Sequence, residues 1–147
     1  MNSVQLTQFF DVPGQELWNA WTLPSVVKKW FGSDPGGSVT SAELDVRPGG
    51  NYAVTFRDGD GTEHTCLGTY TVVSKFDKLS FTWEWKSEPG HVSHVDVEFL
   101  RHDADGVTMK FEHRNLNPQS LHGYEAGWKS TFEKLKACVL ENRITTK

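Results

Sequence analysis

Apolar and polar residues alternate along most of the chain between residues 42 and 113. The alternating segments are Ala42–Val46, Tyr52–Phe56, Glu63–Ser74, Leu79–Trp85, Val92–Leu100 and Val107–His113. A period of two residues is typical of β-strands that turn one face toward the core. Short turns separate them, at Arg47–Gly50, Asp58–Gly61, Lys75–Lys78, Ser87–Gly90 and Asp103–Gly106. Because short connections favour antiparallel neighbours, we expect these strands to form a meander.

Helical patterns precede and follow this region. After a first strand marked by Val4 and Leu6, Pro13–Trp21 and a segment starting at Pro24 predict two short helices, and Gly32 ends the second. The long C-terminal helix begins at Asn117, a good N-cap, and Pro118. Its apolar stripe of about six turns contains Tyr124, Trp128, Phe132, Leu135 and Val139, and its outer face contains Lys129, Glu133 and Lys136. We expect Gly127 to permit close approach of this helix to the sheet.

The order of these elements predicts an α+β fold. Consecutive strands are not interleaved βαβ units, so the sheet needs one covered face, and the last helix is long enough to cover it. We expect a curved antiparallel sheet of six to seven strands around that helix, as one domain over residues 1–147. The covered side is predicted to contain Tyr52, Val54, Phe56, Leu79, Phe81, Trp83, Trp85, Val95, Val97, Phe99, Val107, Met109 and Phe111.

Composition narrows the class of protein. The net charge is −4 and no basic block occurs, which disfavours nucleic acid as a partner. No leader pattern or long apolar run is present, so we expect a cytoplasmic protein without a membrane span. Cys66 and Cys138 are far apart and predict buried thiols rather than a disulfide. Aromatic residues reach 12%, with six Trp, which suits either a Trp-rich core or a pocket lining.

The candidate chemistry is sparse. His64 and Cys66 share a strand face, but no second pair has the spacing of metal ligands. Asp58–Gly61 starts like a calcium loop, yet the later ligand positions hold other residues, so we interpret it as a hairpin turn. We therefore predict no metal, no cofactor and no catalytic residue. His113 continues an inward-facing series, and it is interpreted either as a hydrogen-bonded core residue or as a polar anchor for a ligand.

Four short motifs in order resemble a known family. They are Thr22–Pro24, Lys29–Gly32, Asp45–Gly50, and Gly127-Trp128 with Leu135 in the C-terminal helix. Together they are similar to the family named for the activator of Hsp90 ATPase, within the START-like (SRPBCC) superfamily. The resemblance implies the helix-grip (START/Bet v 1-like) fold with an apolar cavity between sheet and helix. The separate N-terminal domain of the full-length co-chaperone is not matched, which weighs against Hsp90 activation.

The leading hypothesis is a module that binds a small hydrophobic or amphipathic molecule in that cavity. The residues predicted to bind it are Trp30, Phe31, Phe56, Phe81, Trp83, Met109, Phe111, His113, Tyr124 and Trp128. The main alternative is a chaperone-associated or stress-response module that docks a partner through its surface. A third hypothesis is an enzyme, of hydrolase or cyclase type, that uses the same cavity. A measurable cavity favours the first, whereas close packing of these side chains favours the second.

Overall fold

The computed structural model of the protein describes residues 2–102, 106–117 and 121–145. Within these residues the chain forms seven strands and three helices. In chain order they are β1 (Val4–Phe10), α1 (Gly14–Thr22), α2 (Pro24–Trp30), β2 (Ser38–Leu44), β3 (Asn51–Arg57), β4 (Glu63–Ser74), β5 (Lys78–Trp85), β6 (Ser93–Arg101), β7 (Val107–Arg114) and α3 (Leu121–Thr145).

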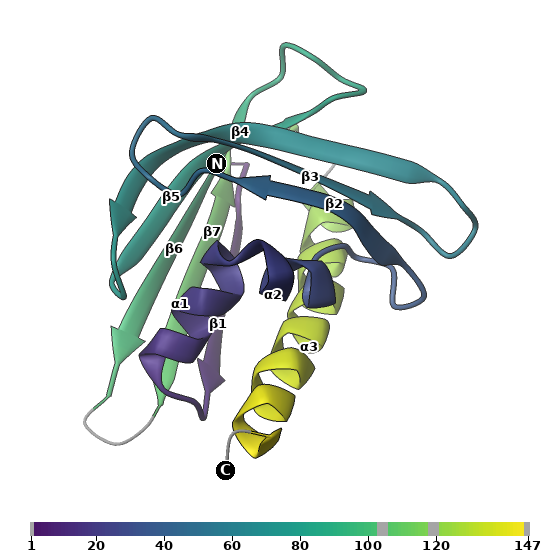
Figure 1. The fold of residues 1–147 in the computed structure, drawn as a ribbon. Helices are drawn as coiled ribbons and strands as arrows, with labels where there is room; N and C mark the ends of the chain where they lie inside the picture. The colour runs from purple at the N-terminus through teal and green to yellow at the C-terminus, as the bar shows by residue number, and fades with distance from the viewer. Residues whose placement is uncertain (1, 103–105, 118–120, 146–147) are drawn as a thin grey trace.

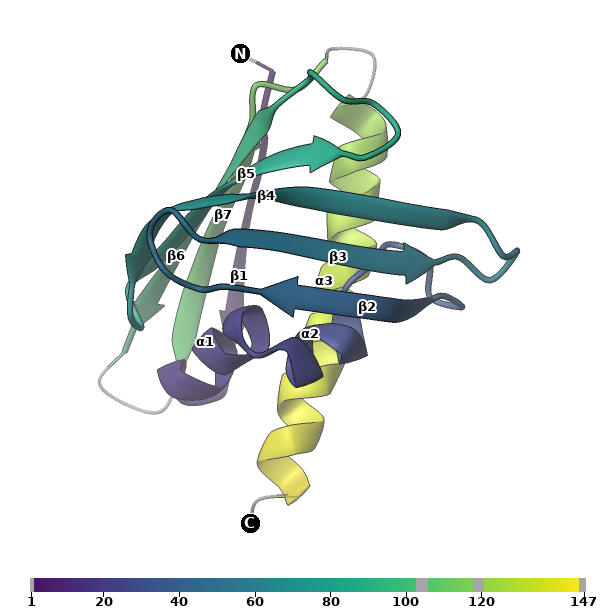
Figure 2. The same ribbon diagram turned by 45° about the horizontal axis from the view of Figure 1, so that its top comes forward.

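All seven strands belong to one antiparallel sheet with the order β1-β7-β6-β5-β4-β3-β2. Strand β1 forms one edge of the sheet and pairs with β7. Figures 1 and 2 show the sheet curving around α3, with α2 beside β2 and α3, and α1 next to α2. The predicted α+β helix-grip fold is confirmed.

The core lies between the concave face of the sheet and the three helices. Inward positions of the strands, such as Val54, Phe81 and Val97, are buried, as the period of two predicts. On α3 the stripe from Trp128 to Val139 is buried, and the predicted outer residues are exposed. The helix phase assigned from the sequence is therefore confirmed.

The region around β2 corrects one prediction. The sequence predicted a strand from Ala42 to Val46, but β2 starts at Ser38 and ends at Leu44. Ser38 pairs with Arg57, and the register shifts between Val39 and Ser41. An edge strand pairs through its backbone, so its polar side chains did not reveal it.

Two further predictions concern the ends and contacts of α3. The start expected at Pro118 and most of the turn at Asp103–Gly106 lie outside the described residues. Gly127 was expected to approach the sheet, but a β-carbon there would instead meet the β-carbon of Ser33 at 3.4 Å. The close approach is thus between α3 and the loop that follows α2.

Other sequence-based expectations concern the cysteines and the membrane. Cys66 and Cys138 are both buried and form no disulfide, as predicted. Burial raises the pKa of the Cys66 thiol, so it stays protonated and unreactive. No helix among the described residues has the length and apolar character needed to cross a membrane.

Gly68 on β4 marks a point where two strands approach unusually closely. An added β-carbon would lie 2.1 Å from the carbonyl oxygen of Thr82 on β5. Since that oxygen belongs to the backbone, relief requires moving a paired strand. Gly68→Ala is expected to lower the free energy of unfolding by about 1–3 kcal/mol in urea denaturation.

A matched control is Gly36→Ala in the exposed loop before β2. A β-carbon at Gly36 meets only Asp34 Oδ1, at 3.7 Å, which is ordinary contact. We expect this change to stay within about 0.5 kcal/mol of the parent. Equal losses in the two variants would contradict the close approach at Gly68.

Candidate functional site

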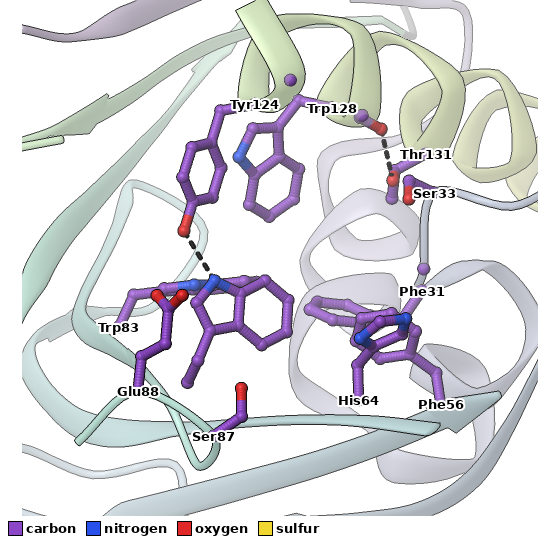
Figure 3. Close-up of a pocket in the computed structure, with 14 residues that line it drawn as sticks. Phe31, Ser33, Phe56, His64, Trp83, Ser87, Glu88, Tyr124, Trp128 and Thr131 are labelled. Carbon is purple, nitrogen blue, oxygen red and sulfur yellow. Dashed lines mark hydrogen bonds between the residues drawn. The ribbon is translucent and has the colours of Figure 1, made fainter. Parts of the chain in front are cut away.

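A cavity of about 460 Å³ lies between α3, strands β3 to β5 and the loop after α2. Figure 3 shows the side chains that surround it, which come from elements far apart in the sequence. Its lining consists of Phe31, Gly32, Ser33, Phe56, His64, Trp83, Trp85, Ser87, Glu88, Gly123, Tyr124, Gly127, Trp128 and Thr131. Ser87, Glu88 and Gly123 are exposed, so the cavity opens to solvent beside them.

Aromatic rings form most of the wall. Trp83 is central, with its ring centroid 5.9 Å from Phe31, 5.3 Å from Trp128 and 5.2 Å from Trp85. Phe56 extends this surface through edge contacts with Phe31 and Trp85. The wall is therefore mainly apolar and made of flat surfaces.

The positions of these rings follow from the spacing of their residues along strands and helices and from the local backbone conformation. Trp83 and Trp85 are two residues apart on β5, so both face α3. Tyr124 and Trp128 are four residues apart on α3, so they lie on one face of the helix. Phe31 directly follows α2 in an extended conformation, which turns its ring toward Trp83. The two α3 side chains and the sheet thus meet around one space.

A hydrogen bond links the two sides of the cavity. Trp85 Nε1 donates to Tyr124 Oη at 2.6 Å, joining β5 to α3 (Figure 3). Burial raises the pKa of Tyr124, although the donated hydrogen bond from Trp85 opposes this effect. The phenol therefore remains protonated at neutral pH and keeps a hydrogen that it can donate.

His113 lies next to this space but does not line it. Trp128 Nε1 donates to His113 Nδ1 at 3.0 Å, so the hydrogen of the neutral imidazole is on Nε2. Nε2 then donates to Ser93 Oγ at 2.7 Å. Burial, and secondarily His94, lower the pKa of His113 to about 3. Both ring nitrogens are engaged by protein groups, as in a hydrogen-bonded core histidine.

The opposite rim carries a polar pair. His64 Nε2 lies 2.8 Å from Asp58 Oδ2, and the His64 ring packs 5.3 Å from Phe56. The sequence placed His64 on the same strand face as Cys66, but only as a weak metal hypothesis. The described residues contain no group of side chains that could hold a metal ion. Here His64 instead supplies a polar edge to an aromatic wall.

The sequence matches a known protein family. The family described as activator of Hsp90 ATPase homolog 1-like protein matches residues 11–140. The chain belongs to this family. None of the curated proteins matches the sequence significantly. The four motifs that suggested the resemblance lie within the matched residues, so that prediction is confirmed.

Solved structures show the same fold. The AHSA1 protein from Silicibacter pomeroyi superposes with a TM-score of 0.84 at 24% identity, over 95% of this chain and 99% of the other. The AHSA1-like protein from Aeromonas hydrophila gives 0.81 at 20%, over 95% and 93%. A protein from Chromobacterium violaceum gives 0.85 at 18%, over 95% and 98%. At these identities the similarity establishes the fold of this AHSA1-like chain and nothing finer.

Half of the residues proposed from the sequence line the cavity. Five line it, namely Phe31, Phe56, Trp83, Tyr124 and Trp128. The other five are buried in the surrounding core and do not line it, namely Trp30, Phe81, Met109, Phe111 and His113. Sequence reasoning did not nominate the polar lining of Ser33, His64, Ser87, Glu88 and Thr131. Most of these residues lie in loops or on weakly patterned strands, where periodicity carries no signal.

Proposed function

We propose that this AHSA1-like protein binds a small hydrophobic or amphipathic molecule in the cavity between the sheet and α3. The observation that carries the proposal is the cavity itself, of about 460 Å³, bounded by aromatic rings. Ligand sites commonly occupy about 300–1,000 Å³, with mostly apolar walls and a few polar groups. We also propose that the protein is cytoplasmic, as expected from its sequence.

The chemistry of the wall supports reversible binding. Burying apolar surface contributes about 25 cal/mol per Å², before the costs of association. Tyr124, His64 and Thr131 add polar groups around the apolar wall, which suits orientation of an amphipathic guest. We expect micromolar affinity for flat or lipid-like molecules.

The family description favours a second candidate, a chaperone-associated module. Such a module would use its outer surface, so its activity would be indifferent to the contents of the cavity. A variant that fills the mouth of the cavity and leaves the rest of the outer surface unchanged therefore separates the two functions. It should abolish small-molecule binding and leave chaperone binding unchanged.

Gly123→Leu is the variant of choice. Gly123 lines the cavity, and nothing lies within 4 Å of a β-carbon built there. Leucine is also a better helix former than glycine by up to about 1 kcal/mol. We expect the variant to lose at least about tenfold in affinity for any lipophile found in a screen by two-dimensional NMR. Its melting temperature should be equal to or above that of the parent.

The matched control is Ala126→Leu, since Ala126 is exposed on the same helix and does not line the cavity. It should bind the same lipophile as tightly as the parent. Undiminished binding by Gly123→Leu would place the ligand elsewhere. A broad screen that perturbs no resonance of Trp83 or Trp128 would remove the binding proposal and leave the interaction module.

A further inference from the structure

A buried hydrogen-bond donor on the cavity wall has no partner. Trp83 is 4% exposed, and its Nε1–H makes no hydrogen bond among the described residues. Buried N–H groups are almost always paired, because leaving one unpaired costs free energy. The ring of Trp83 also lines the cavity, but Nε1 itself is shielded, so a ligand must shift the side chains around this atom to reach it.

A second donor lies beside the first. The Tyr124 hydroxyl oxygen accepts a hydrogen bond from Trp85, and no described residue accepts its hydrogen. The Trp83 N–H approaches the same oxygen closely enough to help lower the pKa of Tyr124, but without the geometry of a hydrogen bond. In Figure 3 the Tyr124 hydroxyl points toward Trp83. Two unused donors thus converge at one end of the cavity.

The charges of the lining residues determine which kind of hydrogen-bond acceptor on a ligand is favoured. Among the described residues that line the cavity there is no Lys or Arg, whereas Glu88 is present. The cationic form of His64 would be balanced by Asp58, 2.8 Å away. A carboxylate placed here would lose its hydration without gaining an opposite charge, which is unfavourable. A neutral acceptor meets the two donors without that cost.

We infer that the cavity recognises an uncharged carbonyl oxygen on a flat apolar molecule, which accepts hydrogen bonds from Trp83 Nε1–H and Tyr124 Oη–H. The inference rests on the proposed binding function and names the chemical class of its ligand. The rings of Phe31, Trp83 and Trp128 provide the apolar faces against which such a molecule lies. Ketones, quinones and amides on aromatic rings belong to this class, whereas fatty acids do not.

A tryptophan elsewhere in the core, Trp21, serves as an internal control. Trp21 also carries a buried Nε1–H without a partner among the described residues. It borders a separate void of only about 20 Å³, which is large enough for about one water molecule. Removal of this second donor should therefore leave ligand recognition unchanged.

The test uses three probes that differ in one group, 2-acetylnaphthalene, 2-ethylnaphthalene and 2-naphthoate. Calorimetry should show the ketone binding about 5- to 150-fold more tightly than the ethyl compound, the usual net effect of two hydrogen bonds. Naphthoate should bind at least about tenfold more weakly than the ketone. In ¹H–¹⁵N spectra, only the ketone should move the Trp83 indole N–H resonance downfield.

Two variants test whether Trp83 is a donor responsible for the preference for the ketone. Trp83→Phe should reduce the preference for ketone over ethyl compound to about two- to tenfold, the effect of the remaining Tyr124 donor, whereas Trp21→Phe should retain the full preference. Should Trp83→Phe fail to fold, the indole shift in the parent protein decides the question. Equal affinity for the ketone and ethyl probes would overturn this inference while leaving the binding function in place. Tight binding of naphthoate would overturn its uncharged character, and failure of all three probes would overturn the aromatic ligand class altogether.

Discussion

Trp128→Ala is expected to lower the free energy of unfolding by about 3–5 kcal/mol. The indole is 5% exposed and contacts rings from both layers, with centroids 4.6 Å from Phe111, 5.3 Å from Trp83 and 5.4 Å from Phe132. Truncation enlarges the cavity and also removes the donor to His113. Because domains of this size are stable by about 5–15 kcal/mol, chemical denaturation should reveal a large shift of the midpoint.

Trp128→Phe separates packing from hydrogen bonding. The smaller ring keeps most of the apolar contacts but leaves His113 Nδ1 without its donor. We expect this variant to lose less than Trp128→Ala and more than a surface substitution such as Lys129→Ala, which is exposed one position away. A loss below about 1 kcal/mol in Trp128→Ala would mean that α3 packs with another face toward the sheet.

Acidification should destabilise the protein through His113. Burial holds the pKa of His113 at about 3 in the folded state, against an ordinary value of 6.5. Between these values the unfolded chain binds one more proton than the folded chain, so stability falls as the pH falls. The expected slope is about 1.4 kcal/mol per pH unit, starting just above pH 6. The contribution is fully present above pH 6.5 and is lost progressively toward pH 3.

The measurement is urea denaturation at several values between pH 4.5 and pH 7. Carboxylates whose pKa is lowered in the folded state, such as Asp96, add a slope of the same sign near the acid end of this range, so a variant that lacks His113 is needed for comparison. Burial alone would raise the pKa of Asp96, but hydrogen bonds from Ser80 and Arg114 lower it below 3.8. In His113→Gln the slope should decrease by about 1.4 kcal/mol per pH unit relative to the parent, whatever its stability at pH 7. An identical slope in the two proteins would show that His113 does not titrate on unfolding.

Much of the fold could be predicted because its signals are local. Alternation along β5 and the three- and four-residue spacing on α3 each identify one apolar face, and Trp83, Trp128 and Phe132 are buried as expected. The α3 stripe also indicated what covers the sheet. The first residues of β2, Ser38–Ser41, escaped detection because their pairing with β3 depends on backbone groups, and their mostly polar side chains lie at a sheet edge.

Two residues on neighbouring parts of the inner face show why the site was harder to predict. Phe111 and Trp83 have the same inward signature in the sequence, yet Phe111 packs against Phe132 at 5.0 Å while Trp83 lines the cavity. Periodicity assigns a side chain to a face, but it contains no information about the distance between that face and the next layer. Non-local packing of α3 against the curved sheet sets that distance.

The sequence by itself therefore determined the order of elements, the inner face of each one and the family. Only the tertiary structure decided which inward-facing rings line the cavity, because the distance between α3 and the sheet depends on how the helix crosses the curved sheet. It also decided that His113 is engaged by Trp128 and Ser93, whereas Trp83 Nε1 has no hydrogen-bond partner among the described residues. Hydrogen-bond partners 15 and 20 residues away along the chain are brought into reach by folding, and no local pattern encodes them.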